Sequence, residues 1–417
     1  VTVKTFHAFG AQLLHTYGEQ IGLPTDFVIV DEAERTGLLR RAFPKLSEAD
    51  ANVCLARISA CKNQLLGPEA AQLAGEVLAG VSGGPLLAAL YRGYEAALCA
   101  AQAVDFDDLL LLSVRLLQTE PQVLAAVHDT YRWISVDEYQ DVNPAQYALL
   151  RLLAAGGANL CVIGDPDQAI YGFRGADPRF FLAFAEDYPG AKQLRLSRSY
   201  RSPQSLLDAA AQVLAAAPNR EAVRLWSEFT EQVKIDVHPA PTDRAEAEQV
   251  VHQIEQMVGG TSYFSLDSGR VDDRNAPPSR SFREFAVLYR LNAQVPLLVE
   301  ALDRSGIPYQ VVGQASPYAA KPVRELLAPL WLLRNARSRV HLDLLLSAGR
   351  SAPSADYLDQ VAQVVAEHDY DLAAGFEDAA ARHTFRPAQR PRLSALARAW
   401  RTFADDAAGV PVTGLLE

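Results

Sequence analysis

Short runs of apolar, often β-branched residues alternate along the chain with longer stretches of helical periodicity. The runs lie at 133–136 (WISV), 160–163 (LCVI), 193–196 (QLRL), 285–289 (FAVLY) and 309–312 (YQVV). Apolar residues recur with helical spacing at 144–153 and 203–214. Short strands that alternate with helices are typical of parallel sheets, so we predict an α/β fold. Ligand-binding groups of such sheets lie at the carboxyl ends of the strands.

Three regions depart from this alternation. Residues 31–103 are rich in Ala and Leu at helical spacing and contain no convincing strand, which predicts an all-helical insertion in the first α/β domain. Residues 325–417 are also expected to be helical. Residues 259–281 are polar and rich in turn formers, which indicates a surface loop.

Composition narrows the class of protein. With 417 residues, 49% hydrophobic and 21% charged, the chain is not disordered, and its length predicts about two to four domains. No apolar run approaches the roughly 18 residues that a membrane span requires, so no membrane partner is expected. The net charge of −11 does not exclude a nucleic-acid partner, because a basic groove is a local feature. The cysteines lack C-x-x-C spacing, so we expect buried thiols and a cytoplasmic location: Cys54, Cys61, Cys99 and Cys161.

Two adjacent carboxylates follow the first of these strands directly. In YRWISVDEYQD, Asp137 and Glu138 lie where the strand at 133–136 ends. Mg²⁺ keeps several waters and takes only one or two protein carboxylates, so Asp137 could hold its water shell. Glu138 could then orient or deprotonate an attacking water. A solvated acidic turn is the alternative interpretation.

The second strand opens into a loop rich in glycine, aspartate and aromatic residues, GDPDQAIYGFRGADP. Gln168 could contact a terminal phosphate or its attacking water. Tyr171 and Phe173 offer flat faces on which bases can stack, and Arg174 suits a backbone phosphate. The alternative is a glycine-rich turn whose aromatic residues belong to the core.

A third strand leads to SRSYRSP and places Arg201 just beyond its end. A guanidinium beside a phosphate is what an arginine finger requires, whereas a surface salt bridge is the alternative.

Taken together, these segments resemble the UvrD/Rep-type superfamily 1 DNA helicases. The motifs DEYQD, GDPDQAIYGFRGAD and LSRSYRSP occur in the order and spacing of that family. Further segments are similar to it as well: TFHAFG, VDFDDLL, FAVLYRLNAQ and GIPYQVVG. The resemblance extends over about residues 1–330.

The resemblance implies an ATP-driven motor with two RecA-like domains, each carrying a helical insertion, that moves 3′ to 5′ on single-stranded DNA. We therefore expect one RecA-like domain at 1–30 and 104–197 and its insertion at 31–103. A second RecA-like domain would follow at 198–324, with the start of a second insertion at 325–417. The expected cofactors are ATP and Mg²⁺. The expected partners are single-stranded DNA, single/double-strand junctions and repair proteins.

The resemblance also implies roles for individual residues. Asp137 would support Mg²⁺, Glu138 would activate water, Gln168 would sense the γ-phosphate and Arg201 would stabilise its charge. Lys62, in a part of the first insertion that lies near duplex DNA in the family, would contact a phosphate, unless it marks a solvated helix end. The remaining candidates would lie along the DNA strand: Thr5, Phe6, His7, Tyr171, Phe173 and Arg174.

One family motif is missing from the chain. No G-x-x-x-x-G-K-[ST] sequence, the loop that cradles a triphosphate, occurs in it, and the later family motifs are not included. We therefore expect both RecA-like domains to be incomplete, and the 417 residues alone neither to bind ATP tightly nor to hydrolyse it. A non-catalytic, helicase-like DNA-binding scaffold subunit of a repair complex is the competing hypothesis. The four candidate ATP-site residues favour the motor.

Overall fold

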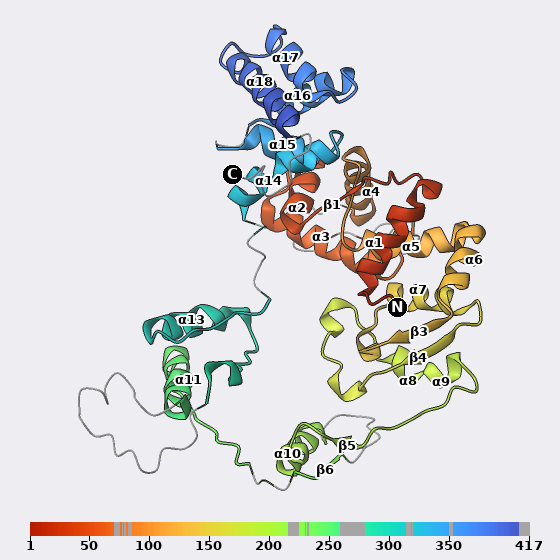
Figure 1. Ribbon diagram of the computed structural model, residues 1–417, viewed down its shortest axis with the longest axis vertical. Coiled ribbons are helices and arrows are strands. Elements are labelled where there is room, and N and C mark those ends of the chain that lie inside the picture. The colour runs from red at the N-terminus through yellow and green to blue at the C-terminus, as the bar shows by residue number, and fades with distance from the viewer. Residues whose placement is uncertain are drawn as a thin grey trace. The chain divides into compact units, whose positions relative to one another are not determined.

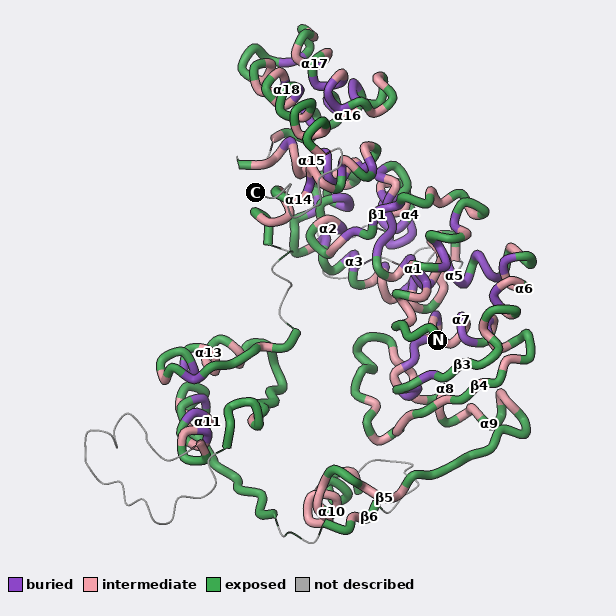
Figure 2. Tube along the Cα trace, in the orientation of Figure 1, coloured by how far each residue is buried: buried purple, intermediate pink, exposed green. Residues whose placement is uncertain are grey.

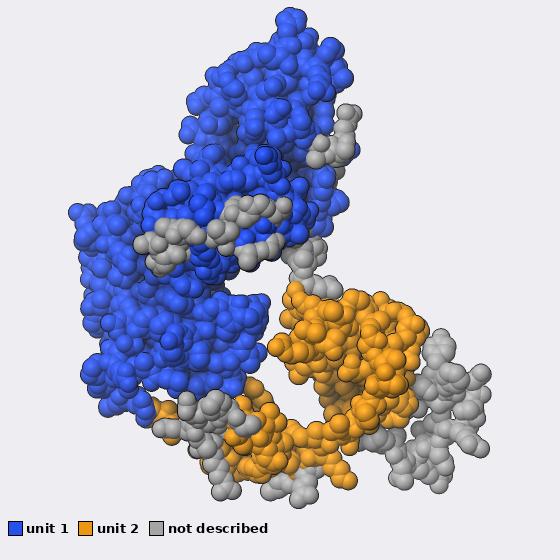
Figure 3. Space-filling model, turned by 180° about the vertical axis from the view of Figure 1, so that it is seen from behind, with its two compact units in different colours: residues 1–193, 317–417 blue, residues 194–316 orange. Residues whose placement is uncertain are grey.

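The chain divides into two compact units, residues 1–193 with 317–417 and residues 194–316 (Figure 3). The computed structural model describes residues 1–70, 76, 78, 81, 86–215, 225–229, 231, 233–258, 280–313, 318, 320–349 and 353–407. Most of the predicted loop at 259–281 therefore lies outside the described residues. Among the described helices, none combines the length and the hydropathy that crossing a membrane would need.

Strands β3 (Trp133–Val136) and β4 (Asn159–Val162) form a parallel pair in the first unit, with Val136 opposite Val162. Both strands confirm the sequence prediction, the second one residue earlier than expected. Helix α7 (Pro144–Ala154) connects them and begins where the sequence predicts, because Asn143 and Gln146 form a capping box ahead of an N-terminal proline. In this region the apolar runs and the helix-capping residues were therefore sufficient to predict both strands and the helix between them.

Four helices of the first unit pack together beside this strand pair. They are α1 (Phe6–Tyr17), α5 (Asp108–Thr119), α6 (Pro121–Thr130) and α7. Their apolar faces share one core that includes Leu14, Leu110 and Leu149, all fully buried. Two short helices after the second strand, α8 (Arg179–Leu182) and α9 (Phe184–Asp187), pack their phenylalanines against Tyr139.

The predicted insertion is helical in its described residues and has a core of its own. It consists of α2 (Glu32–Ala42), α3 (Glu48–Asn63) and α4 (Leu87–Ala100) (Figure 1). The strands β1 (Val28–Ile29) and β2 (Ala103–Val104) pair in parallel where the chain enters and leaves it. Tyr91 and Tyr94 are fully buried in its core. The insertion is therefore a helical body with a hydrophobic core of its own, to which Val340, from the later part of the chain, also belongs.

The described part of 317–417 is helical, as predicted, and belongs to the same unit as residues 1–193. Arg324 bridges Asp31 and Glu34, and the Asn335 amide donates to the Asp26 carbonyl at 2.8 Å. The helices are α14 (Lys321–Arg334), α15 (Arg339–Ser347), α16 (Ala355–Glu367), α17 (Leu372–Ala381) and α18 (Arg390–Ala407).

The second unit is helix-rich in its described residues. Helices α11 (Asp243–Val258) and α13 (Val295–Arg304) each contain buried residues (Figure 2). These residues share one hydrophobic cluster with Ile307. Helix α10 (Gln204–Leu214) confirms the predicted helix. Strands β5 (Arg198–Ser199) and β6 (Trp226–Ser227) pair in parallel.

The strands predicted at 193–196, 285–289 and 309–312 are absent from the described sheets, which are all two-stranded, so that prediction is wrong. A strand needs a hydrogen-bonded neighbour, and these segments pair with no other strand among the residues that the structure describes. Their apolar side chains are largely exposed: Leu194 by 88%, Leu196 by 89%, Leu288 by 95% and Val312 by 83%. Two thiols also depart from the expectation, since Cys99 and Cys161 are exposed, whereas Cys54 and Cys61 are buried.

Candidate functional site

The carboxyl ends of β3 and β4 bring two predicted motifs side by side. Beyond the paired strands, the Ile163 N–H donates to the Val136 carbonyl at 2.8 Å and the Tyr139 N–H donates to the Ile163 carbonyl at 2.9 Å. Asp137 and Glu138 leave the sheet at the edge where the loop from Gly164 begins. The carboxylate pair and this loop therefore lie next to each other at one end of the strand pair.

Glu138 has a backbone conformation that non-glycine residues rarely adopt. Its φ of 52° and ψ of 42° lie in the left-handed region, at a cost on the order of 1–3 kcal/mol. The next residue, Tyr139, is fully buried, and its ring lies edge-on to Phe184 with centroids 5.7 Å apart. Packing on one side and the strand on the other hold Glu138 in this conformation, which leaves its side chain exposed at the strand end.

Gln140 connects the carboxylate pair to the second loop. It is 1% exposed, its Nε2 donates to Glu138 Oε2 at 2.7 Å, and its Oε1 accepts the Asp165 N–H at 3.0 Å. The Asp165 carboxylate in turn accepts Gln168 Nε2 at 2.8 Å. Sequence reasoning missed Gln140; the available signal was an amide placed among the acids of DEYQD, where one side chain can both donate and accept.

Asp137 is the candidate magnesium ligand at the end of β3. It is exposed, and its Oδ1 accepts the Glu138 N–H at 3.0 Å. No group of three or more histidine, cysteine or acidic side chains that could hold a metal occurs in the part of the chain that the structure describes. A Mg²⁺ ion that keeps several water ligands takes only one or two protein carboxylates, and Asp137 supplies one exposed carboxylate; that it holds this ion stays a prediction.

The loop after Gln168 presents two exposed rings and a cation. Phe173 is 78% exposed and Tyr171 37%, and their centroids lie 6.0 Å apart. The guanidinium carbon of Arg174 lies 5.2 Å from the Tyr171 centroid and 5.5 Å from that of Phe173. The alternative that these rings belong to the core is wrong, since core rings would be buried.

The TFHAFG segment forms the start of α1. Thr5 caps the helix by accepting the Ala8 N–H at 3.2 Å, and Phe6 packs partly against the core. His7 stacks on Phe106 with centroids 3.9 Å apart. Burial lowers the pKa of His7 to about 4, so the ring is uncharged at neutral pH. Phe106, 53% exposed, was not singled out from the sequence, although VDFDDLL places an aromatic ring where the insertion ends.

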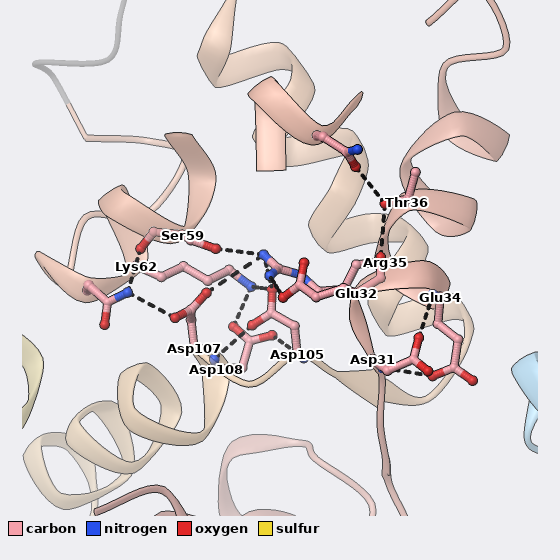
Figure 4. Close-up of polar contacts among 12 residues, drawn as sticks. Asp31, Glu32, Glu34, Arg35, Thr36, Ser59, Lys62, Asp105, Asp107 and Asp108 are labelled. Atoms are coloured by element: carbon pink, nitrogen blue, oxygen red, sulfur yellow. Dashed lines mark hydrogen bonds and ion pairs between the residues drawn. The ribbon is translucent and has the colours of Figure 1, made fainter. Parts of the chain in front are cut away.

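Lys62 is not a DNA contact, and that prediction is corrected. Its side chain is fully buried, and its Nζ lies 3.0 Å from Asp105 and 2.6 Å from Asp108 (Figure 4). The Nζ also lies 2.8 Å from Glu95. Burial opposes its charge, but these carboxylates outweigh burial and hold the pKa of Lys62 well above its usual range. An amine enclosed by three acids can neither meet a phosphate nor form a solvated helix end.

The same buried cluster joins the insertion to the carboxylate motif. Arg35 Nη2 lies 3.4 Å from Asp105, and its Nε donates to the Tyr94 hydroxyl at 3.0 Å. Asn63 donates to Asp107 Oδ1 at 2.9 Å and accepts Asn143 Nδ2 at 2.7 Å. Because Asn143 caps α7, directly after DEYQD, the insertion helps to fix that helix start.

Arg201 lies in the second unit. It is exposed, its N–H donates to Ser199 Oγ at 3.3 Å, and it makes no ion pair within the described residues. Three residues earlier, the guanidinium carbon of Arg198 lies 4.7 Å from the ring centroid of Tyr200 and 5.3 Å from that of Trp226. The role of Arg201 as an arginine finger that stabilises charge on the γ-phosphate stays a prediction.

The chain is similar to known DNA helicases over most of its length. A model of the UvrD/REP helicase N-terminal domain matches residues 1–189, and a model of the UvrD-like helicase C-terminal domain matches residues 194–368. The ATP-dependent DNA helicase PcrA of Staphylococcus epidermidis is 34% identical over 352 residues, 83% of this chain and 45% of that protein. The protein of the same name from Leuconostoc citreum is 35% identical over 340 residues, 80% of this chain and 42% of that protein.

A third relative matches a similar share of the chain. The ATP-dependent DNA helicase PcrA of Staphylococcus aureus is 31% identical over 376 residues, 89% of this chain and 48% of that protein. The chain thus spans about half the length of the curated relatives it matches. Because the two helicase family models together match most of the chain and relatives 31–35% identical cover 80–89% of it, the chain belongs to the UvrD/Rep-type superfamily 1 helicases.

Proposed function

We propose that the chain is a segment of an ATP-dependent DNA helicase that moves 3′ to 5′ on single-stranded DNA. One observation carries the proposal: a chain of hydrogen bonds joins Glu138, through Gln140 and Asp165, to Gln168, in the loop that also presents Phe173. The relatives' names, which specify ATP and DNA, support it.

In this proposal the nucleotide site is built from strand ends. Asp137 supports the Mg²⁺ ion that neutralises phosphate charge, and Glu138 takes up a proton from the attacking water. Gln168 contacts the γ-phosphate, and Arg201 stabilises charge on it in the transition state. The left-handed backbone of Glu138 supports this role, because such strained residues cluster at active sites.

The DNA strand, single-stranded or at a junction with duplex, would pass the exposed rings. Base stacking on Tyr171 and Phe173 tolerates any sequence, and Arg174 is close enough to both rings to meet the adjoining phosphate. Thr5, Phe6 and the stacked pair of His7 and Phe106 would extend this surface through ring and hydroxyl contacts, since His7 carries no charge at neutral pH.

Nucleotide state and DNA contact would be coupled over a short distance. Gln168 ends the turn Pro166–Gln168, and Phe173 lies in the next turn, Gly172–Arg174. A shift of Gln168 towards or away from a phosphate therefore moves the stacking rings.

Activity is assigned to the whole gene product, with ATP and Mg²⁺ as cofactors, in DNA repair or replication in the cytoplasm. The 417 residues alone would neither bind ATP tightly nor hydrolyse it, because they contain no phosphate-binding loop. The rival proposal is a DNA-binding scaffold without turnover; the intact carboxylate pair and Gln168 favour the motor, since a scaffold has no chemical need for them.

The deciding experiment is ATP hydrolysis by the full-length gene product with and without single-stranded DNA. We expect DNA to stimulate hydrolysis, and Glu138→Gln to reduce kcat by roughly 10²- to 10⁴-fold, the usual contribution of a general base. Glu186→Gln, at an exposed position of α9, is the matched control and should leave kcat unchanged. Absence of stimulation in the unsubstituted protein would favour the scaffold.

A further inference from the structure

We propose that Gln140 is a positioning residue that aims the Glu138 carboxylate and transmits the position of the Gln168 loop to it; this rests on the function proposed above. Its side-chain Nε2 donates to Glu138 Oε2 at 2.7 Å, and its Oε1 accepts the Asp165 N–H at 3.0 Å. Gln140 touches neither nucleotide nor DNA in this scheme and acts through Glu138.

Only an amide of this length satisfies both neighbours at once. Glu138, as a carboxylate, needs a donor, whereas the Asp165 N–H needs an acceptor. Because Gln140 is 1% exposed, water has little access to its amide, and loss of the acceptor would leave the Asp165 N–H without its partner. Water can reach the exposed Glu138 carboxylate, but it would not hold that carboxylate in one direction. By holding Oε2, the amide fixes the direction in which the second oxygen of Glu138 faces an attacking water.

The surroundings leave Gln140 little freedom to move. A Cβ atom at Gly164 would lie 2.5 Å from Gln140 Oε1, so the loop backbone passes as close as a glycine allows. The neighbouring Tyr139 and Val142 are buried, at 0% and 2% exposure. A displacement of the Gly164–Asp165 backbone is therefore passed to the amide rather than absorbed by it.

Asp165 extends this connection to Gln168. Its Oδ2 accepts Gln168 Nε2 at 2.8 Å, and its Oδ1 accepts the Asp167 N–H at 3.0 Å, which ties the turn at 166–168 to the residue that Gln140 holds. When Gln168 exchanges its bond to Asp165 for one to a phosphate, the change reaches Glu138 through one side chain. Hydrolysis is thereby favoured only when the loop, with its stacking rings, is correctly placed.

The test compares Gln140→Met and Gln140→Glu in the full-length gene product. Methionine keeps the length but removes both bonds; glutamate keeps an acceptor for Asp165 but offers Glu138 no proton at neutral pH. We expect Gln140→Met to lower the kcat of DNA-stimulated ATP hydrolysis about 10- to 100-fold, as loss of hydrogen bonds to a charged group implies. The KM for ATP and the Kd for a single-stranded oligonucleotide should change less than about threefold, since binding groups are untouched.

Two further results separate positioning from mere structural support. The losses of Gln140→Met and Gln168→Ala should combine to less than their product, because both interrupt one chain of bonds. Gln122→Met, at an exposed position of α6, should leave kcat unchanged. Unchanged kcat in Gln140→Met, or fully multiplicative losses, would overturn the inference.

A measurement without ATP distinguishes failure of this inference from failure of the proposed function. Hydrogen exchange at the Asp165 amide should be slow in the unsubstituted protein, fast in Gln140→Met and slow again in Gln140→Glu. The Tyr139 amide, bonded to the Ile163 carbonyl, serves as internal control and should not change. If DNA does not stimulate ATP hydrolysis by the unsubstituted protein, the motor proposal fails. If the exchange rate of the Asp165 amide is the same in all three proteins, Gln140 does not connect Asp165 to Glu138.

Discussion

Lys62 Nζ lies 2.6 Å from Asp108 Oδ1, with side-chain exposures of 0% and 4%. Replacing Lys62 by methionine would leave Asp105 and Asp108 buried together without their shared cation. We expect Lys62→Met to lower the free energy of unfolding by about 3–5 kcal/mol, the usual result of removing one partner from a buried ion pair. Urea denaturation followed by circular dichroism measures this.

The matched control is Arg92→Met, also in the insertion. Arg92 pairs with Glu69 at 3.2 Å, but both side chains are exposed, so its loss should cost less than about 1 kcal/mol. Equal stabilities of the two variants would contradict the importance of the buried cluster.

Phe173→Ala is expected to weaken binding of a single-stranded oligonucleotide by about 1–3 kcal/mol, with little dependence on its sequence. The ring is 78% exposed, so its loss should not destabilise the fold. Fluorescence anisotropy with labelled homopolymers measures the affinity. Trp133→Ala removes another exposed ring, at the opposite end of β3, and should not alter affinity. A similar loss in both variants would remove Phe173 from the DNA surface.

The parts of the fold that could be predicted are those fixed by local patterns. WISV became β3 because apolar residues end abruptly at Asp137, and α7 begins at a proline that follows a capping residue. The apolar run at 285–289 has the same local character but forms no strand, because a strand also needs a neighbour that local sequence does not reveal.

In the candidate site, too, residues within local motifs could be predicted, whereas residues whose role depends on distant contacts or on burial could not. Asp137, Glu138 and Phe173 could be located because their motifs follow predicted strands. Lys62 was misplaced because its partners, Asp105 and Asp108, lie more than forty positions away in the sequence, and only folding brings them together. Gln140 was missed because its importance depends on burial, which the letters DEYQD do not show.

Arg201→Ala in the full-length gene product is expected to reduce kcat for ATP hydrolysis much more than it weakens DNA binding. A guanidinium that stabilises transition-state charge contributes about 10³- to 10⁵-fold to turnover. Steady-state kinetics and anisotropy on the same preparation give both quantities. Arg198→Ala is the comparison, because that guanidinium already pairs with Glu228. Equal losses of turnover and DNA affinity in Arg201→Ala would rule out the finger role.

Stability should fall as the solution becomes mildly acidic, in part because of His341. Burial and the nearby charge of Arg324 lower the pKa of His341 from 6.5 to about 4. The unfolded chain therefore takes up a proton below pH 6.5 that the folded chain does not, so the stabilising contribution is present above pH 6.5 and lost as the pH falls towards 4. Between pH 7 and 5.5 the loss from this residue is about 1 kcal/mol.

Denaturant titrations at these two pH values test the effect. His341→Gln should show a smaller difference in unfolding free energy between them, whereas His383→Gln, at an exposed position, should behave like the unsubstituted protein. If the pH dependence is identical in all three proteins, His341 does not contribute to it.

Gly164→Ala provides a test of the crowded contact at the strand end. The added Cβ would meet Gln140 Oε1 at 2.5 Å and the Phe181 ring at 3.0 Å, so the amide or the loop must move. We expect kcat of the full-length gene product to fall while the Kd for ATP changes little, because the displaced group positions Glu138 rather than binding nucleotide. Gly172→Ala lies in the same loop with no atom within 4 Å of its new Cβ, and it should retain full turnover. Equal turnover in the two variants would show that the loop accommodates the methyl group without disturbing Glu138.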